Sequence, residues 1–190
     1  EPWARRRTLQ VPTSSLQEQL PDIDNVRRAW GSQQSHMPAF TLRSLRQLPG
    51  ALRAQDGLIT LLVVDDEVVR VDAGKGPARL LGIAFDIGTT TVVGYLHDLE
   101  SGEQLAVSSM LNPQTRYGDD VVSRIEFSAR GADGLEILQR EVIGALNGII
   151  ANTVQAAGVS AQDIIAMTVV GNTTMQHLFL GISPAALAQS

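Results

Sequence analysis

The 190-residue sequence has 44% hydrophobic and 18% charged residues, a globular composition that excludes a disordered or fibrous chain. It has no cysteine, which excludes disulfides, thiolate zinc sites and a cysteine-ligated iron–sulfur cluster within these residues. No apolar run approaches the ~20 residues of a membrane-spanning helix, so we expect a cytoplasmic protein with no membrane partner. The net charge of −5 is uneven, with 11 basic and 9 acidic side chains in 1–79 but 4 and 11 in 80–190. This predicts two segments, and the dispersed basic residues argue against a nucleic-acid partner.

The first part of the chain predicts a linker over residues 1–15, which holds two prolines and three arginines, and a small α+β middle module over residues 16–78. The elements expected in this module, in chain order, are a helix over 16–30 interrupted by Pro21 and capped by Asp22 or Asp24, a helix over 41–48 ended by Pro49, and a hairpin of strands 58–64 and 67–72. No acid, base and nucleophile come together here, so this module is expected to have a structural or docking role.

Residues 79–190 predict an α/β domain with the order βββ-α-α-β-α. Its expected elements are strands 80–87, 91–96 and 104–110, a helix that begins after Asp119 or Asp120, a helix over 135–154, a buried strand 164–170, and a helix that Asn172 caps and Gly181 ends. The short turns between the first three strands predict an antiparallel meander. The long helix carries an apolar stripe that can cover the sheet.

The turn between the first two strands of this domain carries the clearest chemical signal. Asp86 at a strand end can hold Mg²⁺ through its water shell, because Mg²⁺ keeps several waters and takes few direct carboxylates. Gly88 allows close approach of a phosphate, and Thr89 and Thr90 offer hydroxyl and backbone N–H donors. The alternative is an ordinary hairpin turn. A Walker loop is excluded, because no Gly-Lys-Ser/Thr follows.

Three stretches in sequence order resemble the reductive activators of corrinoid enzymes. They are GIAFDIGTTTVVGYLHDLESGE (82–103), LNPQTRYGDDVVSRI (111–125) and TVVGNTTMQHLFLGISP (168–184). The turn and element order also resemble the first half of the actin, heat-shock-chaperone and sugar-kinase ATPase superfamily. The resemblance implies that residues 79–190 form the N-terminal part of a ribonuclease H-like, actin-like ATPase domain. It extends upstream through QVPTSSLQEQLPDIDNVRRAW (10–30) and LPGALR (48–53), which resemble the family's linker and middle domain.

This resemblance implies an intact protein that uses Mg-ATP to pass electrons from a 2Fe-2S cluster to the cobalt of a corrinoid protein. The chain opens with Glu and closes without a final element, so we expect an internal piece that lacks the cluster domain and holds half of the nucleotide cleft. Such a piece is expected to be inactive alone, and a homodimer is expected. The alternatives are a sugar or acyl kinase of the same superfamily and a non-enzymatic docking or dimerisation piece.

The resemblance also implies site residues, carried over only where the motifs match. Asp86 is implied as a catalytic and metal-binding residue, with Gly88, Thr89 and Thr90 as phosphate ligands. Asp120 is implied as catalytic, although helix capping is its alternative role. The predicted second loop that faces the phosphate or substrate consists of Gly171, Asn172 and Thr173, where Asn172 has capping as its alternative.

Five further polar residues keep two interpretations each. Asn112 and Gln114 either orient a substrate or form a turn. Arg124, like Arg116, is a candidate partner for the phosphate or for the carboxylates at 119 and 120. His177 lies early in the last helix, where a lone histidine is more often a core residue than a ligand.

Overall fold

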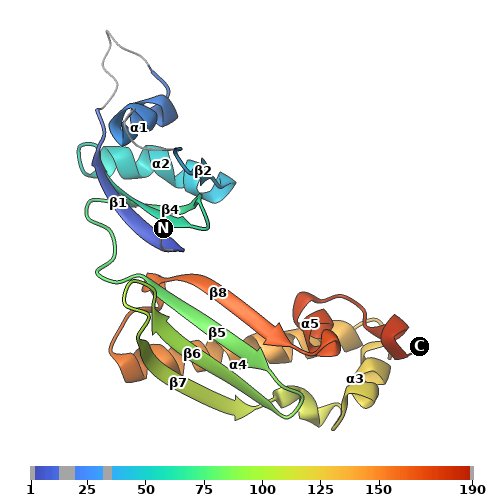
Figure 1. The fold of residues 1–190 in the computed structure, drawn as a ribbon. Coiled ribbons are helices and arrows are strands. Elements are labelled where there is room, and N and C mark those ends of the chain that lie inside the picture. The colour runs from blue at the N-terminus through green and yellow to red at the C-terminus, as the bar shows by residue number, and fades with distance from the viewer. Residues whose placement is uncertain (1–2, 13–19, 32–35, 189–190) are drawn as a thin grey trace. The chain divides into compact units, whose positions relative to one another are not determined.

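The computed structural model describes residues 3–12, 20–31 and 36–188. The chain divides into two compact units (Figure 1): unit 1 comprises Glu1–Leu80 with Leu99–Ser101, and unit 2 comprises Leu81–Asp98 with Gly102–Ser190. Within the described ranges, no helix has both the length and the apolar character that spanning a membrane requires.

Unit 1 is a four-stranded sheet with two helices packed on it (Figure 1). Its elements are β1 (Ala4–Gln10), α1 (Asp22–Trp30), β2 (Ala39–Phe40), α2 (Leu42–Ala54), β3 (Leu58–Val64) and β4 (Glu67–Ala73). The strand order is β1-β3-β4-β2, with β2 parallel to β4 and the other pairs antiparallel.

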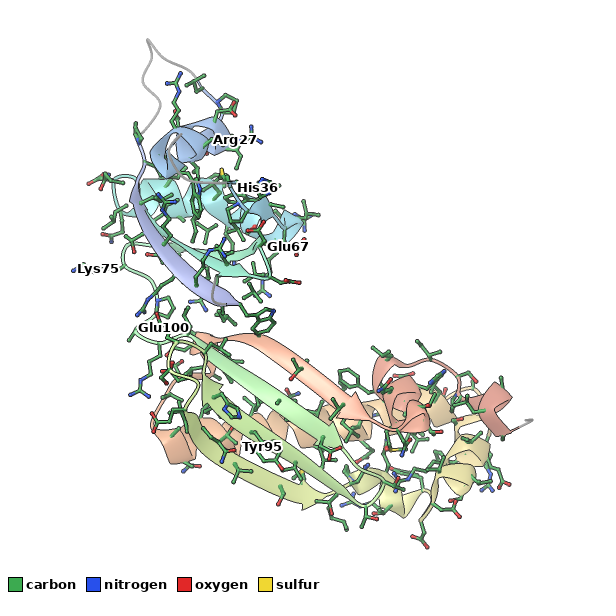
Figure 2. All side chains as sticks on the ribbon, viewed as in Figure 1. Arg27, His36, Glu67, Lys75, Tyr95 and Glu100 are labelled. Carbon is green, nitrogen blue, oxygen red and sulfur yellow. The ribbon has the colours of Figure 1, made fainter. Side chains whose placement is uncertain are left out.

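The predicted hairpin is confirmed, since β3 and β4 pair in antiparallel register around a two-residue turn. Asp65 and Asp66 form this turn with φ angles of 48° and 60°. Asp tolerates this left-handed region, and two such residues match the twist of the flanking strands. Glu67 then begins β4 directly after the turn (Figure 2).

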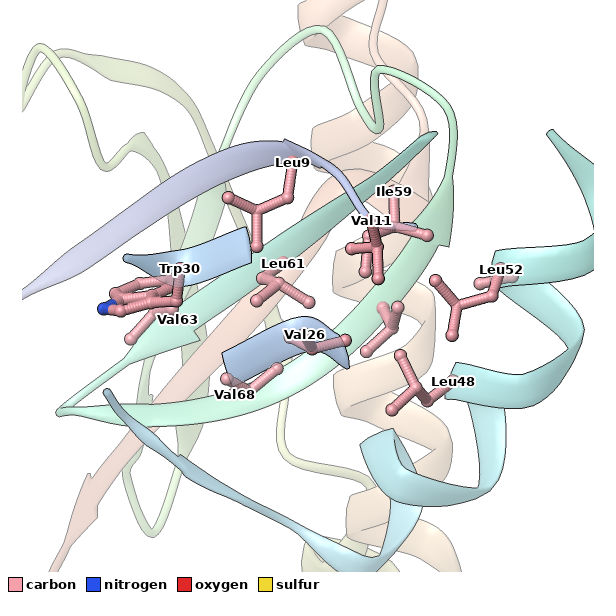
Figure 3. Close-up of a cluster of buried hydrophobic side chains, with 12 residues drawn as sticks. Leu9, Val11, Val26, Trp30, Leu48, Leu52, Ile59, Leu61, Val63 and Val68 are labelled. Carbon is pink, nitrogen blue, oxygen red and sulfur yellow. The ribbon is translucent and has the colours of Figure 1, made fainter. Parts of the chain in front are cut away.

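The core of unit 1 lies between the sheet and the helices (Figure 3). Alternate residues of the strands face the helices, so Ile59, Leu61 and Val63 are fully buried. Val26 from α1 and Leu48 from α2 pack against them. Burying these side chains supplies the hydrophobic stabilisation of the unit.

The prediction of a linker over residues 1–15 is wrong for residues 4–10, which form strand β1. All seven residues pair with β3, and Leu9 is buried in the core. The three consecutive arginines at 5–7 interrupt the apolar pattern of a strand, but they are tolerated because β1 is an edge strand. Arg5 pairs with Asp66 at 3.0 Å, and the guanidinium of Arg7 lies 4.0 Å from the centre of the Trp30 ring.

The end of helix α2 and the start of helix α1 differ from expectation. Helix α2 continues through Pro49 to Ala54, because Leu48 and Leu52 on either side of the proline are buried in the core. Tertiary packing therefore outweighs the hydrogen bond that the proline cannot donate. Helix α1 begins after Pro21, and no side chain caps it; Asp22 instead accepts a hydrogen bond from Arg53 at 3.0 Å. The start of the predicted 16–30 helix and part of 1–15 fall in 13–19, outside the described residues.

Unit 2 has the predicted α/β, ribonuclease H-like order βββ-α-α-β-α. Its elements are β5 (Leu81–Ile87), β6 (Thr91–Asp98), β7 (Gln104–Leu111), α3 (Val121–Ser128), α4 (Gly134–Ala157), β8 (Ile164–Gly171) and α5 (Thr173–Leu180). The first three strands form an antiparallel meander, and β8 joins it parallel to β5, giving the order β7-β6-β5-β8. The meander and each predicted helix are confirmed.

Helix α4 covers one face of this sheet. Leu138, Val142 and Ile149 on the helix pack with Phe85 and other apolar residues of the strands. The expectation that 164–170 is a buried strand is wrong, because β8 lies at the edge of the sheet and Met167 is 50% exposed. A continuous apolar run does not distinguish a central strand from such an edge strand.

Candidate functional site

The predicted phosphate loop after β5 and the predicted phosphate- or substrate-facing loop after β8 meet at one end of the sheet in unit 2. Strands β5 and β8 are parallel and adjacent, with Ile87 opposite Gly171, so the loops that follow them leave from the same edge. The amide Nδ2 of Asn172 donates a hydrogen bond to Oγ1 of Thr89 over 3.2 Å, although the two residues are 83 positions apart. Ligands of open α/β sheets commonly bind at this position, beyond the carboxyl ends of the strands.

Each of the two loops has a glycine at a position where a backbone carbonyl of another residue leaves no room for a Cβ atom. A Cβ atom on Gly88 would lie 2.5 Å from the carbonyl oxygen of Thr91, which already accepts a hydrogen bond from the N–H of Gly88 at 3.0 Å. A Cβ on Gly171 would lie 2.9 Å from the carbonyl oxygen of Ile87. The glycines therefore allow the tight turn and the close contact between the two strand ends.

Asn172 has both of the roles that the sequence left open. Its Oδ1 accepts a hydrogen bond from the N–H of Met175 at 3.0 Å, which caps helix α5, while its Nδ2 contacts Thr89. Thr90, next to Thr89 in the chain, and Thr173, next to Asn172, are both exposed. The first N–H groups of a helix have no intrahelical acceptor, so the start of α5 adds donors to those of the loop after β5.

Asp86 is exposed on the face of the sheet opposite α4. In the strand register it lies between Val93 of β6 and Val170 of β8, and Tyr95 is on the same face (Figure 2). The described residues contain no group of three His, Cys, Asp or Glu side chains that could enclose a metal. A single exposed carboxylate fits Mg²⁺, which keeps most of its waters. A 2Fe-2S cluster does not fit this chain, which has no cysteine ligand to offer.

Asp120 caps helix α3, as its alternative interpretation predicted. Its carboxylate accepts a hydrogen bond from the N–H of Ser123 at 2.7 Å, and the Ser123 side chain hydrogen-bonds back to the Asp120 backbone in a capping box. The hydrogen bonds from the Ser123 backbone and side chain lower the pKa of Asp120. A catalytic role for this exposed residue stays a prediction.

Three fully buried polar side chains lie behind the loop after β5, namely Asn112, Gln114 and Arg124. Asn112 donates to the carbonyl of Gly88 at 2.8 Å, and Arg124 donates to the carbonyl of Thr89 at 2.6 Å. The hydrogen bonds of Arg124 are made inside the protein, so none goes to Asp119 or Asp120, although the charges of both carboxylates act on it. A phosphate partner for Arg124 stays a prediction. Asn112 and Gln114 hold the interior together rather than face a substrate.

The surroundings of Arg124 act on its pKa in two opposite directions. Burial lowers the pKa of Arg124, and the nearby charges of Asp119 and Asp120 oppose this effect. An arginine keeps its proton at neutral pH, so the guanidinium stays a cation.

Of the three buried polar residues, only Asn112 has a recognisable sequence signal for its structural role. An Asn before a Pro is typical of a helix cap, and the Oδ1 of Asn112 accepts a hydrogen bond from the N–H of Gln114 at 3.0 Å.

The remaining candidate, His177, does not belong to the core. It is half-buried on α5, and its Nδ1 lies 2.7 Å from the carbonyl oxygen of Thr173 in the same helix. Arg116 is exposed at the end of the turn Pro113–Arg116.

Comparisons with known proteins agree on one family. Residues 81–190 match the sequence model of the RACo middle region, and residues 1–76 match that of the RACo linker region. The corrinoid activation enzyme RamQ of Eubacterium limosum is 44% identical over 108 residues, which make up 57% of this chain and 18% of RamQ. A solved structure of a reductive activator for corrinoid, iron-sulfur protein is 34% identical with a TM-score of 0.82, over 97% of this chain and 30% of that one. The chain therefore spans less than a third of the length of either relative.

Proposed function

This chain belongs to the RACo family, and on that premise we propose that it is part of an ATP-dependent activator that reduces the cobalt of a corrinoid protein. The names of RamQ and of the related solved structure support a role in corrinoid activation. The electrons come from a 2Fe-2S cluster held outside these cysteine-free residues. The corrinoid protein is the partner, and its cobalt is the substrate.

Within this activator, unit 2 binds the phosphates of ATP through the loops at residues 88–90 and 171–173. The observation that carries this proposal is the hydrogen bond between Asn172 and Thr89, which brings two distant donor-rich loops together at the carboxyl ends of parallel strands. Asp86 holds the water shell of Mg²⁺, which supplies positive charge to the phosphates when bound. Thr89, Thr90 and Thr173 donate to the phosphate oxygens.

ATP is needed because an uphill electron transfer requires an energy input. A cleft that closes around a nucleotide favours one conformation over another by the difference in its affinity for the two. Such closure can bring a protein into the geometry in which the electron is delivered. The homodimer expected from the sequence stays a prediction, which light scattering on the intact protein tests.

Titration calorimetry of the intact protein with Mg-ATP tests the nucleotide site. The Thr89→Val variant keeps the shape of the side chain but removes the hydroxyl that contacts Asn172. A hydrogen bond to a charged group contributes about 1.5–3 kcal/mol, so the affinity of the variant for Mg-ATP should fall by roughly 10- to 100-fold. Thr168→Val, at an exposed position on β8 outside both loops, is the matched control and should bind as the wild type does. Wild-type affinity in Thr89→Val contradicts the proposed site.

A further inference from the structure

Arg124 is a buried cation whose hydrogen bonds all go to neutral acceptors. It has no solvent-exposed surface, and in the described part of the chain none of its hydrogen bonds goes to a carboxylate, although the charges of Asp119 and Asp120 act on it. Its Nη2 donates to the carbonyl of Thr89 at 2.6 Å, and its Nε donates to that of Gly118 at 2.9 Å. Removing a charge from water without a direct counter-charge is costly, so the position calls for an explanation beyond packing.

The partners of this guanidinium belong to both halves of the candidate site. Thr89 lies in the loop after β5, and Met175, whose sulfur is 3.4 Å from Nη1 of Arg124, lies on α5. Helix α5 begins at the loop 171–173, where Asn172 contacts Thr89. Arg124 therefore connects the two loops from behind, while their exposed side faces solvent.

The carbonyls of the loop after β5 are all directed to the protein interior. Gly88 accepts from Asn112 Nδ2 at 2.8 Å, Thr89 accepts from Arg124, and Thr90 accepts from the Asn112 N–H at 2.8 Å. In a trans peptide the C=O and the following N–H point in opposite directions, and the described chain has no cis peptide. The N–H groups of Thr89 and Thr90 therefore point outward. Neither has a hydrogen-bond acceptor in the part of the chain that the structure describes.

We propose that Arg124 is a positioning residue, which holds the carbonyl of Thr89 inward so that the N–H groups of Thr89 and Thr90 face and bind an anionic phosphate. This inference rests on the proposed function and deepens it, because it names the two backbone donors and what orients them. Successive outward N–H groups form an anion-binding concavity. The charge of the guanidinium directly behind the loop adds attraction for an anion, which the charges of Asp119 and Asp120 partly offset.

The test compares three arginine variants of the intact protein. Arg124→Met removes the donors and the charge, and Arg124→Lys keeps the charge but not the fork of donors. Arg130→Met is the matched control, because this exposed arginine just after α3 carries the same charge and forms only a 3.8 Å pair with Glu126. Affinities for Mg-ATP and for adenosine are measured on each variant, together with hydrogen exchange of residues 88–91 in the presence and absence of tripolyphosphate.

We expect Arg124→Met to weaken Mg-ATP binding at least tenfold while adenosine affinity changes less than twofold, with partial recovery in Arg124→Lys and no change in Arg130→Met. A merely structural role would weaken both ligands equally, and that result overturns the inference. If Arg124→Met fails to fold, hydrogen exchange of the wild type still tests the inference. Tripolyphosphate should slow exchange at Thr89 and Thr90, and unprotected amides overturn the inference. Absence of ATP binding by a wild type whose loop is protected by tripolyphosphate overturns the proposed function alone.

Discussion

Replacing Gly88 by Ala should disable the loop after β5 without unfolding unit 2. The added Cβ would lie 2.5 Å from the carbonyl oxygen of Thr91, whereas real Cβ atoms essentially never come closer than 3.0 Å to another atom. The obstacle is backbone, so the turn must open by at least about 0.5 Å, and the 3.0 Å hydrogen bond from Gly88 to Thr91 is strained or lost. A displacement near 1 Å at a binding site can lower activity by roughly 100-fold. We therefore expect Mg-ATP affinity to fall by about 10- to 100-fold.

Titration calorimetry measures this loss, and circular dichroism with thermal unfolding checks that the variant is folded. The matched control is Gly144→Ala on α4, where a Cβ meets nothing within 4 Å. Alanine is favoured over glycine inside a helix by about 0.5–1 kcal/mol, so this control should be slightly more stable and bind nucleotide normally. A folded Gly88→Ala protein with wild-type affinity would refute the argument that this turn carries the phosphate donors.

Three further variants test the core, the helix cap and the metal ligand. In Gly94→Ala the Cβ would lie 2.5 Å from Ile149 and 2.8 Å from Phe85, so urea unfolding should show a loss of about 1–3 kcal/mol; unchanged stability would mean that the core relaxes freely. Asp120→Ala should lower the urea midpoint of unfolding at pH 7, because the side-chain cap of α3 is lost. Because the pKa of Asp120 is lowered in the folded state, the ionised carboxylate stabilises the fold above the unfolded-state pKa, and this stabilisation is lost as the pH falls through the folded-state pKa. The difference in stability between wild type and variant should therefore shrink below about pH 4. A difference that does not depend on pH would contradict this. Asp86→Asn should lower Mg-dependent ATP turnover by roughly 100-fold with an unchanged dichroism spectrum, and full turnover would remove Asp86 from the site.

The sequence predicts unit 2 well because its signals are local. The apolar run ending at Asp86, the glycine at 88 and the β-branched return strand determine the hairpin β5–β6. Asn172 before a polar helix start and Gly181 at its end mark α5 on both sides, and Gly181 has the positive φ of a C-terminal cap. The approach of the two loops also follows from the sequence, once β5 and β8 are taken as parallel neighbours.

The features that the sequence did not predict depend on tertiary contacts. Nothing in the letters around Arg124 distinguishes a buried guanidinium from a solvated one, because its acceptors are backbone carbonyls distributed over the chain. Strand β1 carries three arginines and pairs only with β3, some fifty residues later. Pro49 is tolerated inside α2 because of the core on either side of it, a balance that local propensity cannot represent.

The ATP dependence of cobalt reduction tests the central claim most directly. The intact protein, with its cluster reduced, is mixed with its corrinoid protein, and reduction of the cobalt is followed by the visible absorbance of the corrinoid. The proposed function predicts reduction with Mg-ATP, and a rate at least tenfold lower both without nucleotide and in Thr89→Val. Reduction at the same rate and to the same extent without ATP would contradict the proposal that this domain couples nucleotide binding to electron delivery.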